Sequence, residues 1–214
     1  MRIKSRDYHD YVFKDGRLIG KFEEMYRNSV TVPWGQDKAY SMWYNKISIA
    51  IVQRALEDRR VKAIHELGCG LGYFISRFSR KKYRLSGSDI SPTAIQNARR
   101  AFAEISFQVD DIRVKKRRPC YDLILISALF WYIFPCMRRV VKNIAAMTEK
   151  DGYIFIAEVF PRLNAAFVGK KVIPNPDRLI RWFEPYFKTV IDARLKRAEY
   201  PNEEMVFYWI GKRR

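Results

Sequence analysis

The sequence has few residues of the kinds that bind metals or form disulfides. It contains two histidines, His9 and His65, and three cysteines, Cys69, Cys120 and Cys136, with no Cys-x-x-Cys pair. So few histidines exclude a histidine-rich metal site, and an odd, widely spaced set of cysteines gives neither a zinc site nor a disulfide framework. This composition is typical of a protein from a reducing compartment.

Long apolar runs are also missing. The longest, residues 123–135, is shorter than the roughly 20 residues that a membrane-spanning helix requires, and it is typical of a buried strand and its continuation. The first residues, Met1–Asp7, lack the apolar core of a signal peptide. We therefore expect a cytoplasmic protein that does not associate with a membrane.

Acidic residues are scarce relative to basic ones. There are 41 Lys and Arg against 23 Asp and Glu, which gives a formal net charge of +18. Such a charge raises nucleic acid as a possible type of partner, because neutralising its phosphates releases counterions. The charge is equally consistent with a surface that keeps the protein soluble or that attracts an acidic small substrate. The densest basic runs, Lys115–Arg118 and Lys212–Arg214, contain no aromatic residues that would stack on bases. Nucleic acid is therefore the less favoured partner.

The 214 residues suit one domain, and the order of the apolar segments predicts its class. Residues 1–45 are aromatic-rich and poorly periodic, whereas residues 47–56 have helical spacing. Short apolar runs then alternate with helical stretches, which predicts an α/β domain with a doubly wound, mostly parallel sheet. Only about ten residues join the last two strands, so we expect them to form an antiparallel hairpin at the sheet edge. The seven expected strands are residues 61–67, 83–88, 105–109, 122–127, 152–158, 189–194 and 205–209, and the expected helices after the first begin at residues 73, 91, 137 and 175.

A glycine-rich turn follows the first expected strand. Its sequence, Glu66-Leu67-Gly68-Cys69-Gly70-Leu71-Gly72, places glycines at alternate positions, where the backbone can turn sharply and approach a ligand closely. The spacing differs from the dinucleotide-binding pattern, because Tyr73 stands where that pattern has its third glycine. An acidic residue before the turn is unsuited to a pyrophosphate, but it suits a ligand that carries an ammonium group. We therefore expect Glu66 to face such a group.

Carboxylates also end the next two expected strands. Asp89 lies 23 residues after Glu66, where a carboxylate can accept hydrogen bonds from a ribose diol. Asp110 and Asp111 follow the third strand, where a carboxylate can accept from an exocyclic amine, and Ile112 can cover the face of a base. Each acidic residue alone is equally consistent with a helix cap. Acidic residues at the ends of three consecutive strands favour a nucleoside-binding site.

This combination resembles the signature of class I S-adenosylmethionine-dependent methyltransferases, from about residue 60 to residue 214. The resemblance implies a Rossmann-like domain over residues 46–214 with S-adenosylmethionine as its cofactor, and an N-terminal lid that binds substrate over residues 1–45. It implies that the glycine turn binds the methionine part, that Asp89 binds the ribose, and that Asp111, or Asp110 in its place, binds the adenine amine. The cofactor-binding residues that it implies are Glu66, Gly68, Cys69, Gly70, Gly72, Asp89, Ile90, Asp110, Asp111, Ile112, Ser127 and Ala128, the last two beside the sulfonium.

Two further segments are similar to the NodS-like group of small-molecule methyltransferases. After the fourth strand, Ala128 stands where that group has an acidic residue, so any role of that acid is absent here. Near the N-terminus, the residues Pro33-Trp34-Gly35-Gln36 and then Tyr40 resemble the lid of that group. Trp34 and Tyr40 are therefore expected to cover the cofactor, with aromatic faces toward its sulfonium. The resemblance implies a small polar metabolite, such as a sugar or an amine, as the methyl acceptor.

Candidates for a catalytic base are few. Glu158 ends the fifth expected strand and faces the expected site, although a role as a cap or as the partner of a surface arginine is an equal alternative for it. His9 lies near the N-terminus, where it is either solvated or swings over the site as a base. His65 points to the opposite face of its strand from Glu66, as a core residue does. The alternative functions are a nucleic-acid methyltransferase, suggested by the charge, and a cofactor-binding protein without catalysis, suggested by the scarcity of bases.

Overall fold

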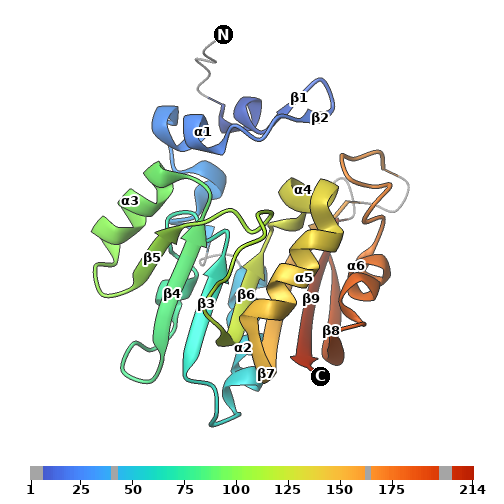
Figure 1. Cartoon of the computed structure of the whole chain (residues 1–214). Coiled ribbons are helices and arrows are strands. Elements are labelled where there is room, and N and C mark those ends of the chain that lie inside the picture. The colour runs from blue at the N-terminus through green and yellow to red at the C-terminus, as the bar shows by residue number, and fades with distance from the viewer. Residues whose placement is uncertain (1–6, 40–42, 162–164, 198–203) are drawn as a thin grey trace.

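Seven strands form one sheet in the computed structural model, which describes residues 7–39, 43–161, 165–197 and 204–214 (Figure 1). In spatial order they are β5 (Ser106–Val109), β4 (Arg84–Asp89), β3 (Ala63–Leu67), β6 (Tyr121–Ser127), β7 (Thr148–Phe160), β9 (Glu204–Arg213) and β8 (Phe187–Arg197). The first five are parallel, and β9 is antiparallel to both of its neighbours. The predicted Rossmann-like sheet with a C-terminal antiparallel hairpin is confirmed. Within that hairpin β9 lies inside the sheet, and β8 alone forms the edge.

Helices cover both faces of the sheet because the central strands alternate their side chains between two cores. One core contains Ile124 and Ile126 of β6, and the other contains Leu123 and Leu125. All four side chains are fully buried, as expected of a strand that is covered on both sides. The helices of the first core are α4 (Phe130–Ile133), α5 (Met137–Met147) and α6 (Pro176–Phe183), and those of the second are α2 (Trp43–Leu56), the 3-10 helix η4 (Ile75–Arg77) and α3 (Pro92–Ala101).

The N-terminal segment lies across the carboxyl ends of the parallel strands (Figure 1). Its elements are η1 (Tyr8–Tyr11), the two-stranded hairpin β1 (Phe13–Lys14) and β2 (Arg17–Leu18), α1 (Phe22–Asn28) and η2 (Pro33–Gly35). Tyr11, Val12, Met25 and Tyr26 form a third buried cluster together with Ala94 of α3. The segment is therefore packed on the sheet domain at the start of α3.

The predicted helix from residue 73 is wrong, because η4 is a 3-10 helix of three residues. The backbone N–H of Ile75 donates to Glu66 Oε2 at 3.0 Å, so a side chain replaces a backbone acceptor. The Ser76 N–H donates to the Gly72 carbonyl four residues back, but the N–H groups of Arg77 and Phe78 donate to carbonyls three residues back. This bonding closes a tight turn that does not continue as an α-helix.

The other expected elements are present with shifted ends. β7 begins at Thr148. The β8–β9 pair is longer than predicted, because its ladder extends from the Phe187–Arg213 pair to the Arg197–Glu204 pair. α6 ends at Phe183, since Phe187 already begins β8 and packs against Trp209 with their ring centroids 6.5 Å apart. Among the described residues, no helix is long and apolar enough to cross a membrane.

Candidate functional site

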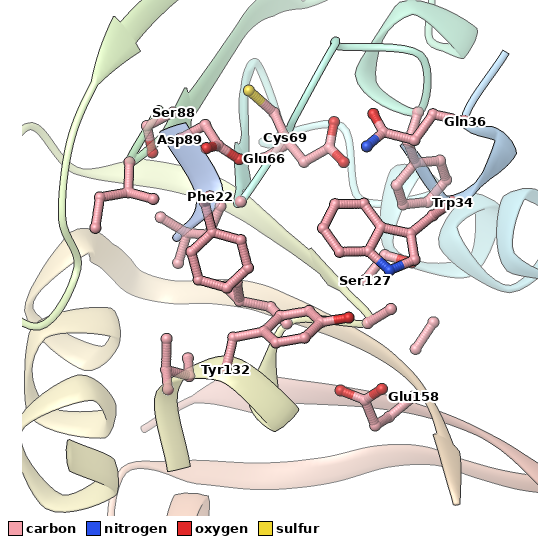
Figure 2. Close-up of a pocket in the computed structure, with 18 of the residues that line it drawn as sticks. Phe22, Trp34, Gln36, Glu66, Cys69, Ser88, Asp89, Ser127, Tyr132 and Glu158 are labelled. Carbon is pink, nitrogen blue, oxygen red and sulfur yellow. The ribbon is translucent and has the colours of Figure 1, made fainter. Parts of the chain in front are cut away.

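A cavity of about 410 Å³ lies at the carboxyl ends of the parallel strands, beneath the N-terminal segment (Figure 2). Its walls come from the carboxyl ends of the five parallel strands and the segments that follow them, from Val206 and Tyr208 of β9, and from N-terminal residues between Tyr8 and Ser48. In open α/β sheets this edge binds ligands, because the loops that follow neighbouring strands project side chains into one space. Of the residues predicted to contact a cofactor, those that line it are Trp34, Glu66, Gly68, Cys69, Asp89, Ile90, Asp110, Asp111, Ile112, Ser127 and Ala128.

The predicted Gly70 and Gly72 belong to the same turn but lie behind its surface. Gly70 has a φ of +52°, and a Cβ there would lie 2.5 Å from Gln36 Oε1 and 2.6 Å from the Tyr26 hydroxyl. Gln36 accepts a hydrogen bond from the Leu71 N–H at 2.9 Å and donates one to the Tyr26 hydroxyl at 2.9 Å. The turn therefore requires glycine for its backbone conformation and for close contact with the N-terminal segment.

Glu66 places a carboxylate at one end of the cavity, next to the glycine turn. It is only 4% exposed, and burial raises its pKa well above the ordinary value, with a further contribution from nearby Asp89. Oε2 accepts from the Ile75 N–H. A carboxylate in such surroundings gains most from a cationic ligand, because the ligand would offset the cost of burying the charge.

Asp89 ends β4 beside Glu66 and is 8% exposed. Its Oδ2 accepts from the Gly70 N–H at 3.0 Å, and its Oδ1 accepts from the Ser91 N–H at 2.9 Å. Burial raises the pKa of Asp89, and these backbone hydrogen bonds only partly oppose that effect. The two N–H groups fix the carboxylate, and each oxygen keeps a lone pair that can accept from a ligand hydroxyl.

The acidic residues after β5 are both held in ion pairs. Asp110 pairs with Arg118 and Lys116, and Asp111 pairs with Arg113. Burial opposes ionisation of both carboxyls, but the hydrogen bonds from these partners outweigh it and hold the pKa of each below its ordinary value. Nothing in the sequence pattern indicated these pairs, because the basic run after residue 112 also fits a solvated loop.

The opposite end of the cavity is formed where β6 and β7 end. Ala128 follows β6 with a φ of +50°, and its N–H donates to the Ala157 carbonyl at 2.8 Å. Glu158 is 2% exposed and accepts from the backbone N–H groups of Phe130 at 3.1 Å and Val159 at 3.2 Å. Burial raises its pKa to about 8. Glu158 therefore lines the cavity and is buried away from the surface, and its hydrogen bond from the Phe130 N–H at the start of α4 also fits the capping alternative.

Aromatic rings line the space between these two ends (Figure 2). The Trp34 ring centroid lies 5.5 Å from that of Tyr8, 6.3 Å from that of Tyr26 and 5.7 Å from that of Tyr132. Phe22 contacts Tyr132 edge to face at 5.2 Å. Sequence reasoning missed Tyr8, Phe22 and Tyr132, because an aromatic residue in an irregular segment gives no periodic signal. Aromatic faces attract cations and exclude water from such a space.

Besides Gly70 and Gly72, two further predicted site residues are not placed in this cavity. His9 pairs with Asp7 at 2.8 Å, stacks on Tyr8 and is not among the lining residues, so the geometry gives it no role as a base. Tyr40 lies outside the described residues. His65 is fully buried and hydrogen-bonds the Ser86 and Ser88 hydroxyls, as expected of a core residue.

These residues fit the parts of S-adenosylmethionine in sequence along the cavity. The buried Glu66 carboxylate, for which the described residues provide no cationic partner, could accept from an ammonium group; the Asp89 carboxylate could accept from a diol; and aromatic rings surround the middle. Of the three glycines in the turn, Gly68 lines the cavity on the same side, and the turn is packed closely against Leu129, Gln36 and Phe107. Among the described residues, no cluster of His, Cys, Asp and Glu is suited to a metal ion.

Comparison with known proteins finds similarity to methyltransferases. A profile described as a methyltransferase domain matches residues 65–154. The chain is 25% identical over 131 residues to the malonyl-[acyl-carrier protein] O-methyltransferase of Bacillus cereus, which aligns with 58% of this chain and 48% of that protein. It is 30% identical over 94 residues to nodulation protein S of Rhizobium tropici, with 42% and 40% aligned. The chain thus spans less than half the length of these curated relatives.

The fold is also similar to that of a solved structure, the N-methyltransferase NodS from Bradyrhizobium japonicum WM9 in complex with S-adenosyl-L-homocysteine. The two superpose with a TM-score of 0.63 and 18% identity, over 78% of this chain and 86% of that one. At this level of identity the likeness shows a shared fold. Residues 65–154, which include the glycine turn and the strands that follow it, thus match a methyltransferase domain within a chain that shares the fold of NodS.

Proposed function

We propose that this protein transfers a methyl group from S-adenosylmethionine to a small polar metabolite, such as a sugar or an amine. The observation that carries the proposal is that acidic residues from three consecutive strand ends, Glu66, Asp89 and Asp111, line one cavity. In the proposed arrangement Glu66 and the glycine turn bind the methionine part, and Asp89 binds the ribose hydroxyls. Asp111 binds the adenine amine, while Ile90 and Ile112 contact the base.

When bound, S-adenosylmethionine supplies a methyl group on a sulfonium, which is a good leaving group. The protein then has to align the acceptor with that methyl group and exclude water, and positioning of this kind contributes about 7–11 kcal/mol in well-oriented reactions. Ser127 and Ala128, between the nucleoside end and Glu158, are proposed to lie beside the sulfonium. The rings of Trp34 and Tyr132 would stabilise its positive charge.

Glu158 is the proposed general base. A pKa of about 8 lets its carboxyl exchange a proton near neutral pH, which suits removal of a proton from an acceptor hydroxyl or ammonium. Figure 2 shows Glu158 at the opposite end of the cavity from Glu66 and Asp89. The acceptor is therefore proposed to enter between Glu158 and the aromatic rings.

The N-terminal segment supports a small acceptor. Tyr8, Phe22, Tyr26 and Trp34 all line the cavity and are packed on the sheet domain. We therefore assign residues 1–45 to a lid that closes the acceptor side, and residues 46–214 to the cofactor-binding domain.

A nucleic-acid acceptor is the second candidate, favoured by the net charge of +18. The densest basic run offers less to a phosphate backbone than its sequence suggests, because Lys116 and Arg118 are paired with Asp110. Binding to nucleic acid through the remaining cations would weaken steeply with salt.

Transfer of a radiolabelled methyl group separates these functions. Wild-type protein is incubated with labelled S-adenosylmethionine and either the small-molecule fraction of a cell extract or bulk tRNA, with Glu158→Gln as the inactive comparison. We expect label in the small-molecule fraction only, and none with Glu158→Gln. Label in tRNA would favour the second candidate. No transfer to any fraction, with S-adenosylhomocysteine still bound, would indicate a binding protein without catalysis.

A further inference from the structure

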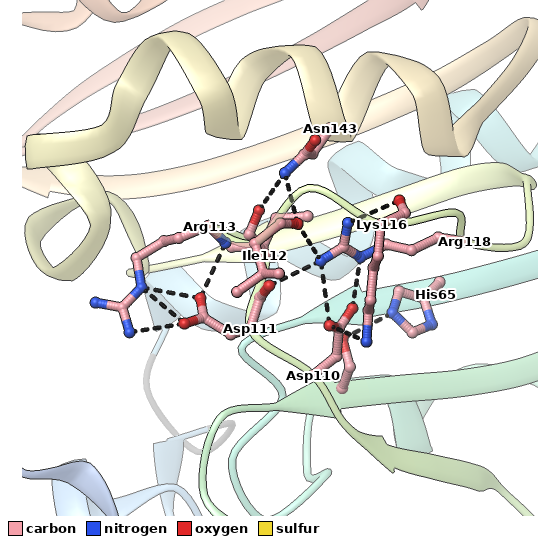
Figure 3. Close-up of polar contacts among 10 residues, drawn as sticks. His65, Asp110, Asp111, Ile112, Arg113, Lys116, Arg118 and Asn143 are labelled. Atoms are coloured by element: carbon pink, nitrogen blue, oxygen red, sulfur yellow. Dashed lines mark hydrogen bonds and ion pairs between the residues drawn. The ribbon is translucent and has the colours of Figure 1, made fainter.

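Arg118 belongs to a basic run that suggests a solvated surface, but its side chain is directed inward. The side chain is 3% exposed, and its partner, the Asp110 side chain, is 2% exposed. Arg118 Nε donates to Asp110 Oδ2 at 2.6 Å, and Nη2 donates to Oδ1 at 3.1 Å (Figure 3). A bidentate pair of this kind fixes both the distance and the orientation of the two groups.

The same guanidinium also binds the backbone of the loop that follows β5. Its Nη2 donates to the carbonyl of Asp111 at 2.7 Å and to that of Val114 at 3.0 Å. On the other side of the loop, Asn143 of α5 donates to the carbonyl of Ile112 at 2.6 Å. Arg118 and Asn143 thus donate hydrogen bonds to the carbonyls of residues 111, 112 and 114. These bonds fix the backbone conformation of the short loop.

That loop presents the two side chains proposed to meet the adenine. Asp111 and Ile112 both line the cavity, and Ile112 is 7% exposed with its side chain in the core on one face of the sheet. The loop is also hydrogen-bonded to the residue proposed to bind the ribose, because the Asp110 N–H donates to the Asp89 carbonyl at 2.9 Å. Displacement of the loop would therefore move the base-binding side chains relative to the ribose carboxylate.

Electrostatics explain why the loop depends on Arg118. Asp110 and Asp111 are adjacent carboxylates, and their charges are compensated by three cations, Arg113, Lys116 and Arg118. Arg113 and Lys116 are 38% and 48% exposed, so solvent weakens their contributions, whereas the Arg118–Asp110 pair is enclosed. Removing one partner of an enclosed pair leaves an uncompensated buried charge.

We propose that Arg118 is a positioning residue for nucleoside recognition, which holds the loop of residues 110–114 so that Asp111 and Ile112 meet the adenine. The inference rests on the proposed function, since it takes the ligand to be S-adenosylmethionine or its demethylated product. Arg118 does not line the cavity, so it acts through the loop. The basic run Lys115–Arg118 is therefore not entirely a solvated surface, because its last residue stabilises the loop from inside the protein.

Calorimetric titration with two ligands tests this role. One ligand is S-adenosylhomocysteine, and the other is S-inosylhomocysteine, in which an oxo group replaces the adenine amine. Wild-type protein is expected to prefer the first by roughly tenfold or more, because the oxo group cannot donate to Asp111. In Arg118→Met and Arg118→Lys this preference is expected to fall to about threefold or less. The matched control is Arg117→Met, which removes an exposed cation of the same run and is expected to keep the wild-type preference.

The preference between the ligands separates positioning from general destabilisation. If Arg118 had only a structural role, its substitution would weaken the binding of both ligands by the same factor. An unchanged preference for S-adenosylhomocysteine in the Arg118 variants would therefore overturn the inference. If Arg118→Met does not fold, the double variant Asp110→Asn with Arg118→Met removes both buried charges and still lacks the bonds to the loop carbonyls. A wild-type preference in that variant would also overturn the inference. If wild-type protein binds neither ligand, the proposed function itself fails. If it binds both equally, cofactor binding stands, but the assignment of Asp111 to the adenine amine fails and the inference fails with it.

Discussion

Glu23 and Thr93 lie 70 residues apart in the sequence, yet the Glu23 carboxylate accepts both the backbone N–H of Thr93 at 3.0 Å and its hydroxyl at 2.7 Å. It also accepts from the hydroxyl of Ser91, the N-cap residue of α3, at 2.6 Å. The Ser91 N–H in turn donates to Asp89. The Glu23 carboxylate therefore joins the N-terminal segment to the start of α3. Through Ser91 it is also connected to Asp89, the residue proposed to bind the ribose.

We predict that Glu23→Gln lowers the free energy of unfolding at pH 7 by about 1 kcal/mol, because a neutral amide makes weaker hydrogen bonds at the helix N-terminus than a partly exposed carboxylate does. Although burial opposes ionisation, the hydrogen bonds from Ser91 and Thr93, with Arg27, outweigh it and lower the pKa of Glu23 from 4.5 to about 2. A lowered pKa gives stability above pH 4.5 that is lost as the pH falls toward 2. Urea unfolding of both proteins across this range measures the difference.

The control is Glu57→Gln, since Glu57 is 66% exposed, lies just after α2 and forms an ion pair with Arg54 at the end of that helix. This variant should unfold like the wild type at every pH. A difference between Glu23→Gln and wild type that persists unchanged at pH 2 would contradict the assignment of the stabilisation to the ionised carboxylate.

Gly70→Ala should weaken S-adenosylhomocysteine binding by roughly tenfold or more, because the added Cβ would displace Gln36 and Tyr26 from the glycine turn. Gly16→Ala is a matched control. Gly16 also has a positive φ, +69°, but a Cβ there would meet nothing within 4 Å. Both variants carry the backbone cost of alanine in the left-handed region, so only the contact differs. Equal binding by the two variants would refute a role for this close packing.

The sheet was predictable from sequence because its signals are local and repeated. Apolar runs and the short connection before β9 gave the strand directions, and the alternating glycines marked the turn after β3. The predicted α-helix after that turn is wrong because the Ile75 N–H bonds Glu66, and no propensity describes a side chain that replaces a backbone acceptor. The positions of Glu66 and Asp89 at strand ends followed directly from the same pattern.

Contacts between distant segments were not predictable. The hydrogen bonds between Thr93 and Glu23 and between Leu71 and Gln36 join the N-terminal segment to the sheet domain, and the poorly periodic sequence of that segment gives no signal for them. Arg118 stood in a run that is equally typical of a solvated surface, and only its 3% exposure distinguishes it. Burial of single charges depends on packing, which a charge count does not describe.

Glu158→Gln should reduce methyl transfer by about 10²–10⁴-fold while S-adenosylhomocysteine binding is retained, because the amide cannot accept a proton. In wild-type protein, burial raises the pKa of Glu158 to about 8, so the rate should rise with pH through 8 as the carboxyl ionises and then level off. Single-turnover rates between pH 6 and pH 10 measure this profile. Glu149→Gln, an exposed position on the same strand, serves as control.

Ionisation of Glu158 as the pH rises has the opposite effect on the stability of the protein. Because the pKa of Glu158 is raised in the folded state, its contribution to stability is present below pH 4.5 and is lost as the pH rises through 8. Glu158→Gln should therefore be more stable than wild type at pH 9, as measured by thermal unfolding. A rate that is flat across pH 8, or a variant that transfers methyl groups as fast as wild type, would exclude Glu158 as the base.

Binding of S-adenosylhomocysteine to wild-type protein and to Asp89→Asn, measured by titration calorimetry, tests the central claim most directly. Each Asp89 oxygen already accepts a backbone N–H, so asparagine would place an NH₂ group against one of these donors and lose a ribose acceptor. The account predicts one site per wild-type chain and affinity at least about tenfold weaker in the variant, with Asp192→Asn, an exposed aspartate of β8, unchanged. No binding by wild-type protein, or equal binding by Asp89→Asn, would contradict it.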